Sequence, residues 1–322
     1  MGWIRNIPTS ILASDISQFF PSLNHCLLTL ILGKAGFDPR VIKFFSNYLI
    51  GRRTQYFWNS FSSPFFNVDV GVGQGSVLSP ILSALYLAPF LHILENHLNL
   101  KFLVSMLSFI DNGLLVAWNK SISFSNSLLF CSYNIVSDLL LKFSLLVEHL
   151  KTKVFHFSRL HSQFNPPSLN LSPLGSSIFY PKESWRYLGF IFDRKLSFWQ
   201  HINFYSNRVI SMVKCMKILG NSVRGLNPHQ KRLLYKSCIL PMALYGFQLW
   251  YYNKASLSYS LKMLGKMQRR VAIWILGAFK ISLSFSIKSI VGLILINLYC
   301  YDLSSELRLH LGKDLRRSKG IW

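Results

Sequence analysis

The chain has 322 residues, of which 51% are hydrophobic and 15% are charged, and its 35 lysines and arginines outnumber its 12 aspartates and glutamates. This composition excludes an intrinsically disordered chain, because such chains are poor in apolar residues and rich in charge. The formal net charge of +23 indicates a polyanion or an anionic membrane surface as partner, since a chain this basic otherwise repels itself.

The first part of the chain alternates irregularly between strand and helix patterns. Apolar, aromatic and β-branched runs predict strands over residues 10–16, 53–59, 65–72, 103–110, 114–118, 154–157 and 185–193. Apolar periodicity and capping residues, such as Ser22, predict helices over residues 23–32, 39–50, 76–92 and 127–143. Residues 161–184 are predicted to be a loop with at most one short strand. Because this order does not repeat a βαβ unit, we expect an α+β sheet with helices on one face.

From about residue 197 onward the chain is mostly helical by its pattern and uniformly basic. No Asp or Glu lies between Arg194 and Tyr301, where 16 lysines and arginines occur. We therefore expect two domains, 1–195 and 196–322. A solvated basic face would normally be balanced by acids, so contact with nucleic-acid phosphates is favoured. The candidate residues are Arg208, Lys214, Lys217, Arg224, Lys231, Arg232 and Lys236.

The cysteines and the apolar segments set further limits. Five widely spaced cysteines without a zinc-binding pattern predict neither a disulfide framework nor structural zinc, and a reducing, intracellular environment is expected. No targeting signal is identified. Residues 76–94 carry no charged side chain, but Pro80 and Pro89 interrupt them. We interpret them as a buried helix, with a membrane span as the alternative.

Two carboxylates stand at predicted strand ends. Asp15 closes the first strand, and Asp111 begins a predicted Asp111-Asn112-Gly113 turn, in which Asn-Gly favours a tight hairpin. Carboxylates that meet at one sheet edge can hold the two divalent cations of an in-line phosphoryl transfer. Taken singly, Asp15 could cap a helix and Asp111 could be an ordinary turn residue.

A glycine-rich segment, Gly71–Pro80 (GVGQGSVLSP), precedes the long apolar helix. Glycines allow close approach of the backbone to a ligand, and a helix N-terminus favours anions. The segment is not a P-loop, because no Gly-Lys-Ser/Thr follows it.

Five segments in order resemble motifs A to E of reverse transcriptases, in particular those of non-LTR, LINE-like retrotransposons. They are DISQFFPSLNH, GVGQGSVLSPILSALYL, SFIDNGLLVAW, KTKVFHFSR and WRYLGFIFDRKLSFWQHI. The resemblance covers residues 11–250, and LPMALYGFQLW and KMQRRVAIWILGAF resemble the segment after the thumb. It implies a right-hand-like polymerase palm followed by a basic, helical, thumb-like domain.

The implied activity is RNA-directed DNA synthesis in the nucleus. Deoxynucleoside triphosphates would be added to the 3′-hydroxyl of a DNA primer on an RNA template, with two Mg²⁺ or Mn²⁺ ions as cofactors. From the apolar segments and the cysteine spacing we expect no membrane partner and no disulfide partner. Asp15 and Asp111 match the catalytic metal ligands, and Lys151 matches a lysine that protonates the leaving pyrophosphate. A solvated lysine is the alternative for Lys151.

Other positions match residues that contact the nucleotide or the primer. Phe20 matches the bulky residue that excludes a ribose 2′-hydroxyl, although Phe19 and Phe20 could both be core residues. Gln74 and Gly75 match the pair near the incoming nucleotide and template. The primer grip of motif E corresponds to Tyr187, Leu188 and Gly189.

The chain also departs from the family pattern. Asn112 stands where motif C has a second catalytic aspartate, and Lys153 stands where motif D has an acid. Only 14 residues precede Asp15, where the family has a long fingers region. We therefore expect a truncated, partly degenerate copy that lacks most of its fingers and is impaired in activity. The alternative is a non-catalytic nucleic-acid-binding remnant.

Overall fold

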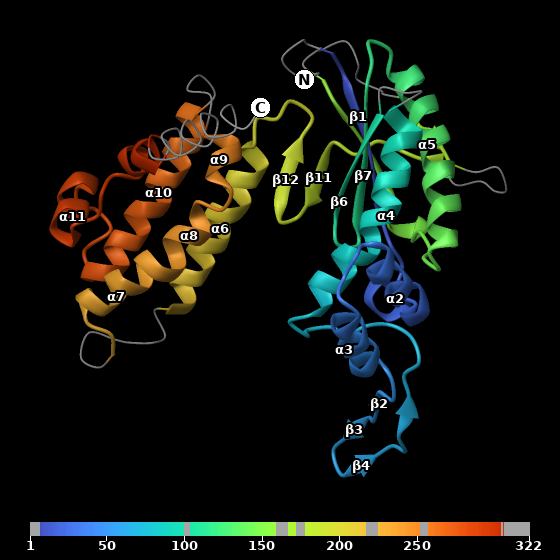
Figure 1. The fold of residues 1–322 in the computed structure, drawn as a ribbon. Helices are drawn as coiled ribbons and strands as arrows, with labels where there is room; N and C mark the ends of the chain where they lie inside the picture. Colours follow the sequence, from blue (N-terminus) through green and yellow to red (C-terminus); the bar gives the residue numbers. More distant parts are fainter. Residues whose placement is uncertain are drawn as a thin grey trace, which may run out of the picture. The chain divides into compact units, whose positions relative to one another are not determined.

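The computed structural model divides the chain into two units, Met1–Glu183 and Ser184–Trp322, which are drawn in Figure 1. It describes residues 7–99, 104–158, 167–171, 178–216, 225–251, 257–303 and 305. The predicted boundary at 195 lies later than this division, because the hairpin that ends at Asp193 belongs to the second unit.

An antiparallel sheet organises the first unit. Its strand order is β6-β7-β1-β8. The strands are β1 (Thr9–Asp15), β6 (Val104–Phe109), β7 (Asn112–Trp118) and β8 (Lys153–Phe157). Alternation of apolar residues explains the burial of Leu12, Leu115 and Val154 on the covered face.

Two long helices, α4 (Ser79–Asn99) and α5 (Ile122–Lys142), cover one face of this sheet, as Figure 1 shows. The rings of Tyr86 and Phe90 in α4 pack edge-to-face with the ring of Phe143, at centroid–centroid distances of 6.2 and 5.9 Å. The predicted α+β sheet with helices on one face is therefore confirmed. The helix predicted over residues 76–92 is found as α4, which begins at Ser79 and extends to Asn99, and its inner face is buried at Leu82, Tyr86 and Phe90.

Three helices follow β1: α1 (Phe19–Ser22), α2 (His25–Lys34) and α3 (Pro39–Leu49). The predicted cap of the second helix at Ser22 is wrong. Asn24 caps it, because its side chain accepts a hydrogen bond from the backbone of Leu27 at 3.0 Å.

An arm extends from the first unit between α3 and α4 (Figure 1). It contains β2 (Arg53–Thr54), β3 (Phe57–Trp58), β4 (Phe61–Ser62) and β5 (Phe66–Asn67). β2 pairs with β5 and β3 pairs with β4, both antiparallel. Two further short strands, β9 (Leu169–Asn170) and β10 (Ile178–Phe179), form a separate pair where at most one strand was predicted.

The second unit begins with a hairpin of β11 (Ser184–Tyr187) and β12 (Phe190–Asp193). The sequence predicted one continuous strand here, but Leu188 and Gly189 have φ values of 46° and 83° and make the turn. A helical body follows. Its elements are α6 (Trp199–Met216), α7 (Pro228–Leu234), a π-helical turn η3 (Tyr235–Ile239), α8 (Leu240–Ala243), α9 (Phe247–Trp250), α10 (Leu257–Leu276) and α11 (Ser284–Val291).

Each unit has its own apolar core, that of the second unit being built from α6, α8, α10 and α11. The five cysteines are free thiols. Among the described residues no single helix is both long and apolar enough to cross a bilayer. One bent pair, Ser284–Val291 with Ile296–Leu303 at 56°, reaches that length and composition only when the two helices are taken together.

Candidate active site

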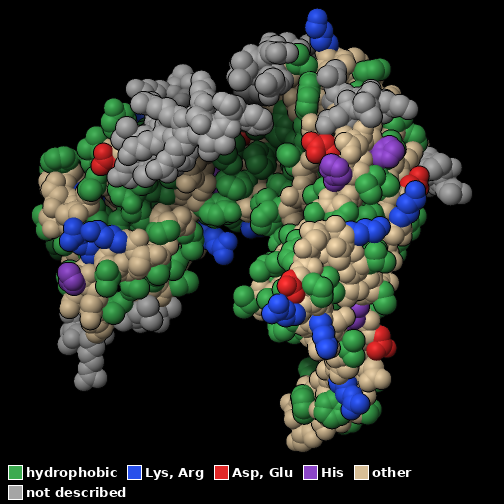
Figure 2. All heavy atoms as spheres, in the orientation of Figure 1, with side chains coloured by type: hydrophobic (Ala, Val, Ile, Leu, Met, Phe, Trp, Pro, Cys, Tyr) green, Lys and Arg blue, Asp and Glu red, His purple; other side chains and the backbone are tan. Residues whose placement is uncertain are grey.

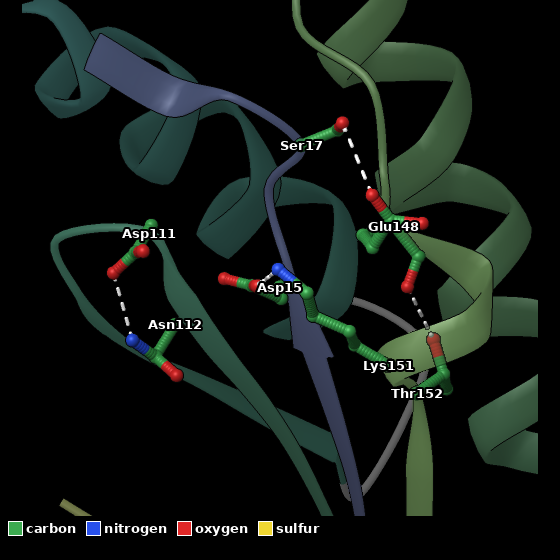
Figure 3. Close-up of polar contacts among 7 residues, drawn as sticks. All are labelled: Asp15, Ser17, Asp111, Asn112, Glu148, Lys151 and Thr152. Atoms are coloured by element: carbon green, nitrogen blue, oxygen red, sulfur yellow. Dashed lines mark hydrogen bonds and ion pairs between the residues drawn. The ribbon is translucent and has the colours of Figure 1, made fainter.

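The sheet brings Asp15 and Asp111 to one edge. Asp15 is the last residue of β1 and lies opposite Asn112 in the antiparallel register. The backbone nitrogen of Ile16 donates a hydrogen bond to the carbonyl oxygen of Asp111 at 2.9 Å. The two aspartates that the sequence singled out therefore stand on adjacent strand ends, as Figure 3 shows.

One oxygen of Asp15 is paired and the other is not. Its Oδ2 accepts a hydrogen bond from Lys151 Nζ at 2.8 Å. Its Oδ1 is buried and has no hydrogen-bond partner among the residues that the structure describes. A buried carboxylate oxygen without a donor is costly unless a cation or donor reaches it. Figure 3 shows the Asp15 carboxylate between Lys151 and the hydrogen-bonded pair of Asp111 and Asn112.

Lys151 is held beside Asp15 by the backbone. It ends the short helix η1 (His149–Lys151), and the nitrogen of the preceding Glu148 donates to the carbonyl oxygen of Asp15 at 2.8 Å. The hydrogen bond to Asp15 raises the pKa of Lys151, and attraction to Asp15, Glu148 and Asp111 adds to this effect. The lysine therefore stays protonated at neutral pH.

Asp111 sits in a turn that differs from the predicted one. Phe109 and Asn112 form the closing pair of the β6–β7 hairpin, so Ile110 and Asp111 make the turn. Asn112 and Gly113 belong to β7, and the predicted Asn-Gly turn is wrong. Ile110 has a φ of 57°, a left-handed conformation that costs a non-glycine residue about 1–3 kcal/mol.

Asn112 interacts directly with the carboxylate beside it. Its Nδ2 donates to Asp111 Oδ1 at 2.7 Å, as drawn in Figure 3. An aspartate at this position could not donate this bond and would repel Asp111. The asparagine therefore stabilises the turn in the absence of a cation. The site then carries one negative charge fewer than it would with an aspartate at this position.

Glu148 is a third carboxylate near the site that the sequence reasoning missed. Its Oε2 accepts a hydrogen bond from Ser17 Oγ at 3.2 Å, and its charge acts on Lys151. The sequence offered one signal for Glu148. Acids are rare in this chain, with only 12 in total, and this one lies three residues before Lys151.

The donor set can be tested against a divalent cation. No group of three or more His, Cys, Asp or Glu side chains that could hold a metal occurs in the described part of the chain. Mg²⁺, however, is usually bound by one or two carboxylates together with substrate phosphates. Asp15, with its orphaned oxygen, and Asp111 fit that smaller set, with Lys151 as a competing cation on Asp15.

The glycine-rich segment packs against the residues that follow Asp15. The nitrogen of Gly71 donates to the carbonyl of Leu23, and that of Val72 to the carbonyl of Phe20, both at 2.8 Å. A Cβ on Gly71 would lie 2.5 Å from the carbonyl oxygen of Pro21, and its φ is +80°. Only glycine fits this approach.

The predicted nucleotide contacts lie around this segment. Phe19 is buried, whereas Phe20 is only half-buried against the core, so the two neighbours do not share one role. Gln74 and Gly75 are exposed in the turn before α4.

The predicted primer grip, Tyr187–Gly189, lies in the second unit, where Tyr187 ends β11 and Leu188 and Gly189 make the hairpin turn. Tyr245 Oη donates to the carbonyl of Leu188 at 2.8 Å, and Tyr205 Oη donates to that of Gly189 at 2.9 Å. Both tyrosines were missed by the sequence reasoning. No local pattern marks them, because they reach the turn from α6 and from the segment after α8.

His201 anchors the same hairpin. Its Nδ1 accepts from the backbone nitrogen of Ile191 at 3.2 Å, and its Nε2 lies 3.0 Å from the carbonyl of Tyr245. These partners assign the neutral imidazole with hydrogen on Nε2. Burial lowers the pKa of His201.

The predicted phosphate-binding residues differ in their environment. Arg208, Lys214 and Lys236 are exposed on the helices of the second unit. Lys231 lies over the ring of Trp274 at 5.8 Å. Arg232 donates from Nη2 to the carbonyl of Gly292 at 2.9 Å. Lys217 and Arg224 lie outside the described residues.

Comparison with known proteins gives the family. Residues 5–192 match the model described as reverse transcriptase (RNA-dependent DNA polymerase), which is more than half of the chain. The chain belongs to the reverse transcriptase family. The match covers the elements from β1 to β11 and most of β12, and thus both carboxylates of the candidate active site.

The individual proteins that resemble this chain are only distantly similar to it. The probable RNA-directed DNA polymerase from transposon BS of Drosophila melanogaster is 31% identical over 65 residues, which are 20% of this chain and 7% of that protein. The apo telomerase of Candida tropicalis gives a TM-score of 0.46 at 12% identity, over 87% of this chain and 43% of that one. Telomerase from the same species with a TWJ fragment of telomeric RNA gives 0.40 at 10% identity, over 89% and 49%. This chain thus spans less than half of either telomerase, and likenesses this weak carry no functional argument.

Proposed function

We propose that this reverse transcriptase is an RNA-directed DNA polymerase of a LINE-like retroelement, and that Asp15 and Asp111 are its metal ligands. The observation that carries the proposal is the meeting of these two aspartates on adjacent strand ends, with the Oδ1 of Asp15 buried and unpaired. The motif order and the transposon origin of the Drosophila relative support the retroelement assignment.

In the proposed reaction, the primer 3′-oxygen forms a bond to the α-phosphorus of a deoxynucleoside triphosphate, and pyrophosphate leaves. Bound divalent cations would stabilise the charge that develops on the attacking and leaving oxygens. The role of Asp15 and Asp111 is to hold that positive charge at the sheet edge. The 3′-hydroxyl gives its proton to water as its oxygen bonds to phosphorus, and the leaving pyrophosphate takes a proton from the Lys151 ammonium. Solvent then reprotonates Lys151, whose side chain is exposed.

We further propose that the activity is impaired by Asn112. An asparagine leaves one full negative charge fewer in a site that must attract dications. Its amide also donates to Asp111 Oδ1, so this oxygen is engaged before a metal arrives. Lys151 engages Asp15 in the same way. Both aspartates are therefore already engaged by side chains of the chain itself, Asp15 by a cation and Asp111 by a neutral amide.

The second candidate is a nucleic-acid-binding remnant without catalysis. The contacts that already engage the two aspartates within the chain favour it, as does the acid-free basic stretch of the second unit. Phosphate contacts from that unit would persist without a working metal site.

Primer extension distinguishes these functions. A DNA primer on an RNA template is incubated with deoxynucleotides and either Mg²⁺ or Mn²⁺, using the chain as written, Asn112→Asp, and Asn112→Asp combined with Asp15→Ala. We expect no detectable extension with Mg²⁺ by the chain as written, and extension by Asn112→Asp that Asp15→Ala abolishes. Binding of the primer–template without extension by any form would instead support the remnant.

A further inference from the structure

The arm of the first unit, residues Arg52–Val68, presents a dense set of exposed rings; we call it the aromatic arm. Six of the eleven residues from Tyr56 to Phe66 are aromatic. All six are exposed, with Phe57 at 73% and Trp58 at 78%. The rings belong to Tyr56, Phe57, Trp58, Phe61, Phe65 and Phe66. Figure 2 shows hydrophobic and basic side chains together at this lower end of the first unit.

The backbone of the aromatic arm is well connected. Ser63 is buried and forms its hub, because its hydroxyl accepts from the nitrogen of Tyr56 at 2.9 Å and its own nitrogen donates to the carbonyl of Tyr56 at 2.9 Å. Gln55 Nε2 donates to the carbonyl of Ser63 at 2.7 Å. The hydrogen bonds of the arm thus hold the rings outward, while only Tyr56 and Phe66 form a ring pair, with centroids 5.8 Å apart.

The arm contains a narrow range of side-chain types. Between Gln55 and Asn67 every apolar side chain except Pro64 is aromatic, and the remaining residues are Asn and Ser. A core-forming surface would include Leu, Ile, Val or Met, which this stretch lacks. Flat rings separated by small hydrogen-bonding side chains suit nucleobases, since every base offers a face for stacking.

The charge at the base of the arm agrees with an anionic ligand. Arg53 is exposed and forms no ion pair among the described residues. Arg52 donates from Nη1 to the carbonyl of Gly71 at 2.7 Å and thereby ties the arm to the glycine-rich segment. A nucleic-acid strand bound along the arm would therefore lead towards the candidate nucleotide site of the same unit.

We propose that the aromatic arm is a stacking surface for single-stranded RNA. The stacking surface is argued from the arm alone, and its assignment to RNA rests on the proposed function, in which the template is RNA. The rings would stack on successive bases, while Arg53 would contact a phosphate.

The test is binding of the full chain to a labelled oligouridine of about 12 nucleotides, within the range of single-strand sites. A matched oligomer with abasic residues keeps the phosphates but offers no bases. Binding is measured in a metal chelator and without nucleotides, so that catalysis plays no part. The arm variant is Phe57→Ala/Trp58→Ala/Phe61→Ala. The control, Phe124→Ala/Tyr180→Ala/Phe285→Ala, removes three exposed aromatics from other elements.

We expect the arm variant to lose at least about tenfold in affinity for oligouridine, because each stacked base contributes a measurable share of binding. We expect no such loss on the abasic oligomer or in the control. The ratio between the original chain and the arm variant should stay constant as salt is raised, since stacking releases no counterions. Because this binding is measured without metal or nucleotides, it does not depend on primer extension, so failure of the polymerase proposal and failure of this one are separable.

Three results would overturn the proposal. One is oligouridine affinity within twofold of the original chain in the arm variant. Another is an equal loss on the abasic oligomer or in the control variant. The third is that the arm variant loses self-association, measured by light scattering, or vesicle binding, measured by flotation with phosphatidylcholine, while its RNA affinity is unchanged.

Discussion

The ammonium nitrogen of Lys151 lies 2.8 Å from Oδ2 of Asp15, so the first candidate metal ligand is ion-paired within the chain. The pair is partly open to solvent, because the Lys151 side chain is 63% exposed. It holds a monovalent cation where the proposed reaction needs a divalent one. Lys151 and a metal ion therefore compete for the same carboxylate.

Removing Lys151 should strengthen metal binding. In Lys151→Met the competing charge is absent, and we expect the affinity for Mn²⁺ to rise about two- to fivefold, the range of an exposed ion pair. Electron paramagnetic resonance of free Mn²⁺ measures this directly. The control is Lys153→Met, an exposed lysine two residues away that has no ion pair among the described residues. Equal affinities in the two variants would contradict the competition.

Asn112→Asp should lower the stability of the metal-free protein and raise its affinity for metal ions. The change removes the 2.7 Å hydrogen bond to Asp111 and places two carboxylates side by side, so the metal-free thermal midpoint should fall. With Mn²⁺ the extra charge should raise affinity about tenfold or more. Titration calorimetry and thermal melting measure the two effects. Asn67→Asp, an exposed site on the aromatic arm, should change neither.

The exposed basic residues of the second unit should set the salt dependence of binding. With about five phosphate contacts, log K for a primer–template duplex should fall with log salt at a slope near −4. Replacing Arg208, Lys214 and Lys236 together by glutamine should reduce the slope by about 3. The matched control replaces Lys34, Lys43 and Lys142, exposed lysines of the first unit. An identical change of slope in the control would show that net charge alone acts.

Gly71→Ala and Gly75→Ala form a matched pair for stability. Both glycines have positive φ, but a Cβ at Gly71 would lie 2.5 Å from a carbonyl oxygen of Pro21, whereas nothing lies within 4 Å of one at Gly75. We expect Gly75→Ala to lose about 1 kcal/mol of unfolding free energy and Gly71→Ala to lose about 3 kcal/mol or more. Urea denaturation measures both. Similar losses would mean that the contact with Pro21 has no role.

The second unit should lose stability in mild acid because of His201. Burial lowers its folded-state pKa, while in the unfolded chain a histidine has a pKa of about 6.5. As pH falls through that value, the unfolded state takes up the proton first, so unfolding becomes more favourable. The thermal midpoint should fall between about pH 7 and pH 5, and less so in His201→Gln. His229→Gln, at an exposed position of α7, should keep the full decrease.

Much of the site could be predicted because its signals are local. Asp15 and Asp111 were found as carboxylates at the ends of apolar runs, and antiparallel pairing of those runs brings them together. The exact turn was not predictable in the same way. Asn-Gly is the stronger local turn signal, yet pairing of Asn112 with both Phe109 and Asp15 draws it into β7 and forces Ile110 into a left-handed conformation.

The sequence by itself determined the composition, the order of strands and helices, the two carboxylates and the resemblance to reverse transcriptases, because these depend on residue type and spacing. Only the tertiary structure decided which partners those residues have. Lys151 is 136 positions from Asp15, and Tyr245 is 57 positions from Leu188. Pairings over such separations depend on how the sheet and helices pack, and no short pattern in the chain encodes them.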